Sequence, residues 1–263
     1  MFPLLVNLGP IPIHSYGFFV ATGFLASVAV IRRLARRAKI SEEKILDLTF
    51  WGLIAGFGGA RILFILTRLD HFSAHPLDMI KVWEGGLVFL GAPFALIPFI
   101  VWYCRKHRMG IWNTLDVLIP GVTIAHAFGR IGCLGAGCWY GKPTGGHWGV
   151  RLHSELVEES LRGVLLHPTQ LYEAAALAIL LGGLVWLFRN RKFEGQVILT
   201  YFLAYPMIRS IIEIFRGDQI RGFVIPGLLS TSQFISILLF SATVGVWIVR
   251  LRQVNKKAAR GRE

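Results

Sequence analysis

The sequence predicts an all-α protein, a polytopic membrane bundle of about seven transmembrane helices with a small head on the outer face. Composition, long apolar segments and an uneven distribution of basic residues predict it. Hydrophobic residues make up 54% of the 263 positions and charged residues only 16%, and the mean hydropathy is +0.57. This profile is typical of a membrane protein with several spans and not of a soluble domain.

Seven apolar segments, each near the ~17–25 residues that cross the hydrocarbon, supply the predicted helices. They cover residues 15–31, 45–66, 87–103, 115–134, 171–188, 196–214 and 231–249. The third is short and contains Pro93 and Pro98, which favour a kink or a partial span. Ser41, Glu42 and Glu43 predict a helix start before the second segment, because a hydroxyl caps a helix and acids suit its positive end.

The formal charge of +13 is distributed unevenly between the two sides of the predicted bundle. Alternate connections and the C-terminal tail carry 18 Lys and Arg residues, and the opposite connections carry 7. The side rich in basic residues is expected to be cytoplasmic, which places the N-terminus in the periplasm and the C-terminus in the cytoplasm. The basic surface is therefore expected to face anionic lipid headgroups rather than nucleic acid.

We expect residues 1–263 to form a single integral membrane domain. The polar, glycine-rich segment 138–167 is expected to form a periplasmic head insertion, and 250–263 a basic cytoplasmic tail. The first apolar segment is interpreted as a retained anchor, because no basic region precedes it as in a cleaved signal peptide.

Three arginines, Arg61, Arg130 and Arg209, lie deep inside predicted spans. Each follows the inner edge of its span by about 13–16 residues, which at ~1.5 Å per residue places it roughly 20–24 Å into the membrane. A guanidinium stays charged in a protein, so its burial in lipid requires an anionic partner. Phospholipid phosphate is the commonest anion there, which predicts a lipid headgroup site.

The sixth span carries Tyr205, Arg209, Glu213 and Arg216 at spacings of four, four and three, so they share one helical face. Arg209 and Glu213 are expected to pair, which lowers the free energy needed to bury both. Taken alone, this pattern is equally compatible with an ion pair that only stabilises the bundle.

The polar groups of the first and fifth spans fall at the same predicted level. Tyr16 begins the first span, and Gln170, Tyr172 and Glu173 begin the fifth. They are candidate substrate contacts, although Tyr is also an ordinary interface anchor. His167 is a candidate base or a solvated surface histidine. No cluster of His, Cys and carboxylates has ligand spacing, so neither a metal nor another cofactor is predicted.

Cys133 and Cys138 lie at the outer end of the fourth span. A separation of five does not place two side chains together on a regular helix. A disulfide between them requires a broken helix, which Gly135 and Gly137 permit, so this pairing stays an open alternative.

Several of these motifs, in this order, resemble the prolipoprotein diacylglyceryl transferase family of bacterial inner membranes. The matching segments are Ile13–Gly17, Gly58–Arg61, Val82–Leu87, Gly129–Gly141, His167–Glu173 and Tyr205–Arg216. The resemblance implies transfer of the diacylglyceryl group of phosphatidylglycerol to the lipobox cysteine of a preprolipoprotein, the first step of lipoprotein maturation, with release of glycerol phosphate.

The resemblance also implies roles for single residues. Arg130 and Arg209 would hold the lipid phosphate, and Tyr16, Tyr205 and Glu213 would complete the catalytic site. The predicted phospholipid contacts are Arg130, Arg209, Arg61, Gly141, Gln170, Glu173 and Arg216.

The chain departs from the family pattern in a few places. Leu90 stands where the family usually has a polar residue, often His, and Ala92 replaces a glycine. Cys133 and Cys138 replace an Asn and a Glu. A leucine accepts no proton, so a base would have to come from Tyr16, Tyr205, Glu213 or His167. The substrate brings its own thiol, which argues against either cysteine as an enzyme nucleophile.

Two other functions stay open at this stage. A non-catalytic phospholipid-binding relative is suggested by Leu90 and Ala92. An anion or proton transporter is suggested by the buried arginines and acids, but the sequence lacks the inverted repeats that would favour it.

Overall fold

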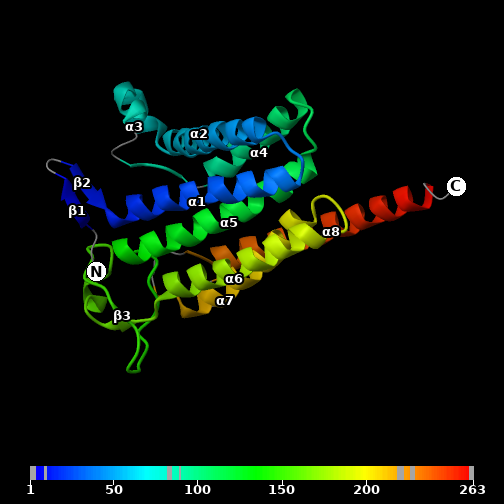
Figure 1. Ribbon diagram of the computed structural model, residues 1–263. Helices are drawn as coiled ribbons and strands as arrows, with labels where there is room; N and C mark the ends of the chain where they lie inside the picture. Colours follow the sequence, from blue (N-terminus) through cyan, green and yellow to red (C-terminus); the bar gives the residue numbers. More distant parts are fainter. Residues whose placement is uncertain are drawn as a thin grey trace. The chain divides into compact units, whose positions relative to one another are not determined.

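A computed structural model describes residues 4–8, 11–81, 85–88, 90–217, 222–225 and 229–260. These residues form an all-α protein, as the sequence predicts (Figure 1). The helices are α1 (Ser15–Arg37), α2 (Glu42–Leu66), α3 (Leu69–Ala74), α4 (Gly91–Lys106), α5 (Ile111–Ala136), α6 (Thr169–Asn190), α7 (Gln196–Phe215) and α8 (Thr231–Arg260), with 3-10 turns η1 (Pro76–Ile80) and η3 (Glu159–Leu161).

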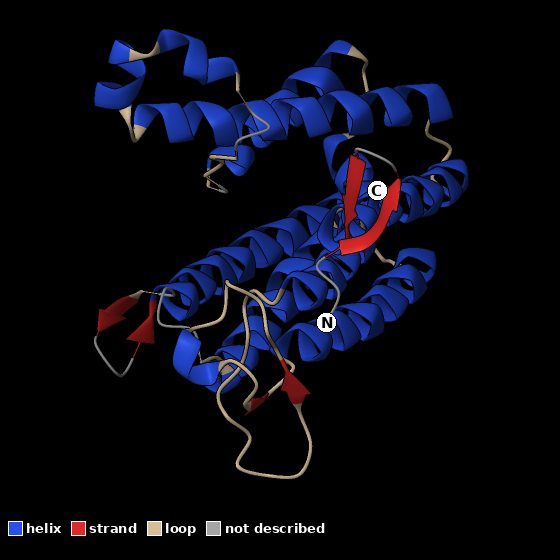
Figure 2. Cartoon of the chain, turned by 90° about the vertical axis from the view of Figure 1, so that its left-hand side faces the viewer, coloured by secondary structure: helices blue, strands red, loops and turns tan. Residues whose placement is uncertain are grey.

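Short strands form three antiparallel pairs outside the helices (Figure 2). The pairs are β1 (Leu4–Leu8) with β2 (Ile11–His14), β3 (Val150–Arg151) with β4 (Leu165–Leu166), and β5 (Phe223–Ile225) with β6 (Leu229–Ser230). The first pair leads directly into α1 and the third directly into α8. The hairpins therefore flank helices and do not build a β-sheet core.

Six of the described helices are long and apolar enough to span a membrane, namely α1, α2, α5, α6, α7 and α8. They confirm six of the seven predicted spans. The remaining predicted span, the third, corresponds to α4. This helix has 16 residues with Pro98 inside it and begins at Gly91 rather than at residue 87. At ~1.5 Å per residue it is about 24 Å long, shorter than the ~30 Å hydrocarbon.

The predicted start of the second span is also confirmed. α2 begins at Glu42, and Ser41 is its N-cap, with the hydroxyl accepting from the backbone N–H of Lys44 at 3.5 Å. Glu42 forms ion pairs with Arg32 and Arg36 near the end of α1. The turn between these helices is thus fixed by a cap and by paired charges.

By its internal contacts the chain divides into two compact units, Met1–Val30 with Ile119–Glu263, and Ile31–Leu118. In the first unit α7 packs against both α6 and α8. In the second, α2 packs along α4. The expected single domain stays a prediction.

The segment 138–167 contains β3, η3 and β4 and has a small apolar core of its own. Tyr140, Leu152, Val157 and Leu166 are buried there together. The Tyr140 hydroxyl also accepts from the backbone N–H of Glu158 at 3.3 Å. This core gives the expected head insertion a fixed shape around its first residues, which lie beside the candidate site.

Close packing of α2 on α4 depends on two glycines, Gly59 and Gly91, whose backbones touch. A Cβ on either would collide with the other's carbonyl oxygen. Small residues at such a crossing allow helices in a membrane to approach closely.

Arg61, two residues after Gly59 in α2, is buried by the chain between α3 and α4. Its guanidinium donates to five backbone carbonyl oxygens at 2.6–3.2 Å, those of Asp78, Met79, Lys81, Gly85 and Gly86. That number equals the five N–H donors of a guanidinium. Arg61 therefore anchors this loop within the second unit.

The same loop is closed by a surface ion pair. The Asp78 carboxylate lies 2.6 Å from Lys81 Nζ. The hydrogen bond from Lys81 lowers the pKa of Asp78. Glu84, which belongs to one matched motif, lies outside the described residues.

We predict that Arg61→Ala and Arg61→Lys both destabilise the second unit, by about 2 kcal/mol or more for the alanine variant, because five partly buried carbonyls lose a charged donor. Lysine fails to rescue because its three donors sit on one atom. Thermal unfolding in detergent, with proteolysis around residues 78–88, measures the effect. Arg68→Ala is the control, since within the described part of the chain the Arg68 guanidinium lies over the Phe64 ring and the residue is exposed. Equal stability of Arg61→Ala and Arg68→Ala would contradict the anchoring role.

Candidate active site

The end of α7 presents the polar face that the residue spacing predicts. Arg209 Nη2 lies 2.7 Å from Glu213 Oε2, and Arg216 Nη1 lies 3.2 Å from the same oxygen. All three residues are buried. The predicted Arg209–Glu213 pair is confirmed, and the structure adds Arg216 as a second cation on that carboxylate.

A second set of interacting charged side chains joins α5 to α6. Arg130 Nε lies 3.2 Å from Glu173 Oε2 and donates to His126 Nε2 at 3.3 Å. Tyr205 of α7 donates its hydroxyl to Glu173 Oε1 at 2.9 Å. Glu173 is 2% exposed. One buried carboxylate thus connects three helices.

These two sets of charged side chains form one cluster. Arg209 interacts electrostatically with Glu173 and Tyr205 as well as with Glu213 and Arg216. Among the described residues, the cluster contains three guanidiniums and two carboxylates. A cluster of cations inside a membrane helix bundle is suited to an anionic ligand.

The turn after α5 completes one side of this cluster. The helix ends at Ala136, and Gly137 has a φ of +82°, which turns the chain. Gln170 Nε2 donates to the Cys138 carbonyl and Thr169 Oγ1 to the Trp139 carbonyl, both at 2.7 Å. The first residues of α6 therefore hold the turn in place.

Cys133 and Cys138 are not joined by a disulfide in the structure. The helix is broken between them, as a disulfide would require, and Cys138 Sγ lies 3.7 Å from the Cys133 carbonyl oxygen. The structure thus describes the reduced pair.

Gly141 lies where three backbone segments cross. It forms a β-bridge with Arg216, and its N–H donates to the His167 carbonyl at 3.1 Å. A Cβ at this position would lie 2.5 Å from that carbonyl oxygen and 2.9 Å from the carbonyl oxygen of Phe215. Only glycine fits, so Gly141 sets the position of Arg216.

Tyr16 and Gln170 lie in the same unit as the cluster. Tyr16 is half exposed and packs against Gly132 of α5, less than one turn from Arg130. Gln170 is buried, and among the described residues its Oε1 has no hydrogen-bond partner. His167 Nδ1 lies 3.1 Å from the Tyr172 hydroxyl.

Two positions of interest belong to the other unit. Arg61 donates to the loop carbonyls described above, which favours an anchoring role, while lipid binding by Arg61 stays a prediction. Leu90 is the N-cap of α4 and is 55% exposed.

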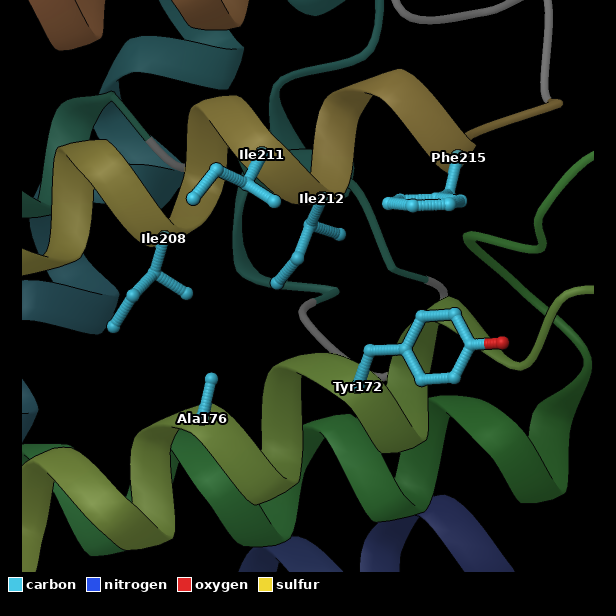
Figure 3. Close-up of a pocket in the computed structure, with 6 residues that line it drawn as sticks. All are labelled: Tyr172, Ala176, Ile208, Ile211, Ile212 and Phe215. Carbon is cyan, nitrogen blue, oxygen red and sulfur yellow. The ribbon is translucent and has the colours of Figure 1, made fainter.

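An apolar pocket of about 360 Å³ lies between α6 and α7 (Figure 3). It is lined by Tyr172, Ala176, Ile208, Ile211, Ile212 and Phe215. These residues alternate along the two helices with Glu173, Arg209 and Glu213, so the pocket lies on the face next to the charged one. Charged and apolar surfaces thus meet on the same two helices.

Comparison with known proteins identifies the family. The family model for prolipoprotein diacylglyceryl transferase matches residues 3–249. The chain belongs to this family.

Relatives named phosphatidylglycerol–prolipoprotein diacylglyceryl transferase align over most of the chain. The one from Clostridium tetani is 34% identical over 257 residues, covering 98% of this chain and all of the relative. The one from Lactobacillus acidophilus is 30% identical, covering 97% and 92%. One from Clostridium perfringens is 32% identical, covering 86% and 87%. Together with six candidate spans, they establish a multi-pass membrane protein of a transferase family.

From the sequence, His126 is a candidate base or a solvated histidine, like His167, and Trp139 has no assigned role. His126 lies four residues before Arg130, a spacing that brings side chains together on a helix and could have indicated the contact. Trp139 follows the end of α5, where helical periodicity no longer applies. Its ring meets Arg130 and Arg216, which no sequence pattern relates.

We predict that Gly141→Ala disrupts the crossing of the three segments, because the added Cβ meets two carbonyl oxygens that cannot move independently. Both thermal stability and transferase activity should fall, activity by about tenfold or more. Activity on a lipobox peptide and unfolding in detergent measure these effects. Gly146→Ala is a control for the head, since its φ lies outside the left-handed region and a Cβ there meets no atom closer than 3.8 Å. A fully active Gly141→Ala enzyme would contradict the crowding argument.

Proposed function

We propose that this chain transfers the diacylglyceryl group of phosphatidylglycerol to the lipobox cysteine thiol of a preprolipoprotein, the first step of lipoprotein maturation. The observation that supports the proposal most is the cluster of Arg130, Arg209 and Arg216 around the buried Glu173 and Glu213 in a member of a transferase family. Phosphatidylglycerol presents one anionic phosphate, which these cations can bind.

The two carboxylates of the cluster orient the guanidiniums, leaving the phosphate to be bound by the arginines. Glu213 contacts Arg209 and Arg216 through a single oxygen, and Glu173 contacts Arg130 through Nε. A guanidinium binds phosphate oxygens through paired N–H groups, and such charge-assisted bonds are among the stronger ones in proteins. We assign phosphate binding to Arg130, Arg209 and Arg216.

The reaction forms one bond and breaks one. The thiolate sulfur attacks the diacylglyceryl carbon that carries the phosphate, a C–S bond forms, and the C–O bond to phosphate breaks with its electrons. Glycerol phosphate leaves with the negative charge that the thiolate brought. Charge accumulates on phosphate oxygens in the transition state, so fixed guanidiniums there lower the barrier.

Removal of the thiol proton does not require a strong base. An ordinary cysteine has a pKa of ~8.5, so a few per cent is already thiolate at neutral pH. Leu90 is therefore compatible with turnover. Among the candidate bases, Glu213 is bound to two guanidiniums and Tyr205 donates to Glu173, so we assign them to holding the site.

The location follows from the charge distribution and the proposed substrates. We propose that the chain lies in the bacterial inner membrane with the N-terminus in the periplasm and the C-terminus in the cytoplasm. The cluster would then lie toward the outer leaflet, where a membrane-bound preprolipoprotein presents its lipobox cysteine. The apolar pocket beside α7 would accommodate lipid acyl chain while the phosphate meets the charged face.

We predict that Arg130→Ala and Arg209→Ala each reduce thioether formation by roughly 10²-fold or more, because each removes a donor that stabilises the leaving phosphate. Mass spectrometry of a lipobox peptide incubated with purified protein in phosphatidylglycerol vesicles measures the product. Arg33→Ala, an exposed arginine of α1, is the matched control and should keep full turnover. Normal turnover in both cluster variants would refute the assignment.

A complementation experiment distinguishes a catalyst from a non-catalytic lipid-binding relative. We predict that this chain restores growth and lipoprotein modification in bacteria depleted of their own transferase, because the proposed chemistry does not require a histidine at position 90. Leu90→His provides an internal comparison in the same assay. Lipid binding without rescue by the unmodified chain would favour the non-catalytic alternative.

A further inference from the structure

The indole of Trp139 contacts two arginines of the charged cluster. The Cζ atom of Arg216 is 4.5 Å from the ring centroid, and that of Arg130 is 5.4 Å from it. Because these two distances add to 9.9 Å, the two Cζ atoms lie no farther apart than that. Trp139 is thus in contact with a cation from α5 and with another from the end of α7.

The backbone fixes this ring in place. Trp139 has a φ of +62°, a backbone conformation that residues other than glycine adopt only where the surrounding structure imposes it. Its carbonyl accepts from Thr169 Oγ1, and the carbonyl of the next residue, Tyr140, accepts from the N–H of Gly217 at 3.2 Å. The turn is therefore held at both α6 and the end of α7.

Burial does not explain why a tryptophan occupies this turn. The side chain is 46% exposed, so it is not a core residue, and glycine would adopt the same backbone conformation with less strain. The ring's contacts with Arg130 and Arg216 are a more specific explanation. They also have a physical basis, since a cation is attracted to the face of an indole more strongly than to other aromatic rings.

An aromatic face suits a phosphate site in a way that another carboxylate would not. A carboxylate binds the N–H groups of arginine and competes directly with phosphate for them. An aromatic face attracts the guanidinium while making no hydrogen bond to its N–H groups, which lie in the guanidinium plane. A ring therefore restricts the motion of an arginine without neutralising its charge.

We infer that Trp139 is a positioning residue for the transfer reaction, which holds Arg130 and Arg216 in the arrangement that binds the phosphate of the lipid donor. This inference rests on the proposed function and extends it to a residue that touches neither reacting atom. Loss of the ring should weaken phosphate binding through the arginines and leave binding of the peptide substrate unchanged.

Three variants test the inference in phosphatidylglycerol vesicles. Trp139→Leu removes the aromatic face and should raise KM for phosphatidylglycerol roughly 5- to 30-fold, as expected for two cation–π contacts, with KM for the peptide unchanged. Trp139→Phe should restore most of the loss. Trp139→Gly relaxes the strained turn, so it should be stably folded and should share the raised KM.

The glycine variant separates positioning from a purely structural role. If Trp139 only shaped the turn, Trp139→Gly would keep a normal KM for phosphatidylglycerol, and that result would overturn the inference. Trp186→Leu, on the exposed side of α6, is the matched control and should behave as wild type. Absence of any thioether product from the unmodified protein would instead reject the proposed function itself.

Discussion

The charged cluster depends on one shared oxygen, Glu213 Oε2, which contacts Arg209 and Arg216 together. Burying a guanidinium in a membrane protein is unfavourable unless a counter-charge meets it, and breaking a buried pair leaves an uncompensated charge. One carboxylate that serves two cations makes both burials possible and ties the last turn of α7 to the residue that follows it. The contact with Glu213 holds the Arg216 side chain, and the β-bridge to Gly141 holds its backbone.

The same contacts that build the site also hold the fold around it. Arg216 pairs with Gly141 through the backbone and meets the Trp139 ring through its side chain, while Thr169 and Gln170 hold the carbonyls of the same turn. Loops that carry function are usually positioned by a rigid scaffold. Here the scaffold is formed by the starts and ends of membrane helices. Site and head segment are therefore expected to lose order together.

Much of this arrangement could be predicted from spacing within single helices. The spans follow from apolar length, and the polar face of α7 follows from the period of 3.6 residues. Spacing within one helix does not show which side chains of different helices meet. Depth alone grouped Arg61 with Arg130 and Arg209, yet Arg61 donates to five carbonyls of its own loop. The pairing of Arg130 with Glu173 depends on how α5 meets α6, and the Trp139 contacts depend on a turn beyond the helix end.

The composition of the cluster also indicates which part of the reaction the protein assists most. Both described carboxylates of the cluster contact guanidiniums, and Tyr205 donates its proton toward Glu173, so these groups orient cations rather than await a proton. The attacking thiol is already partly ionised near neutral pH, whereas a phosphate oxygen must gain charge as the C–O bond breaks. A site built from arginines, held by carboxylates and an indole ring, stabilises this charge on the leaving phosphate. A leucine at position 90 is consistent with such a mechanism, because stabilising the leaving group does not require a histidine there.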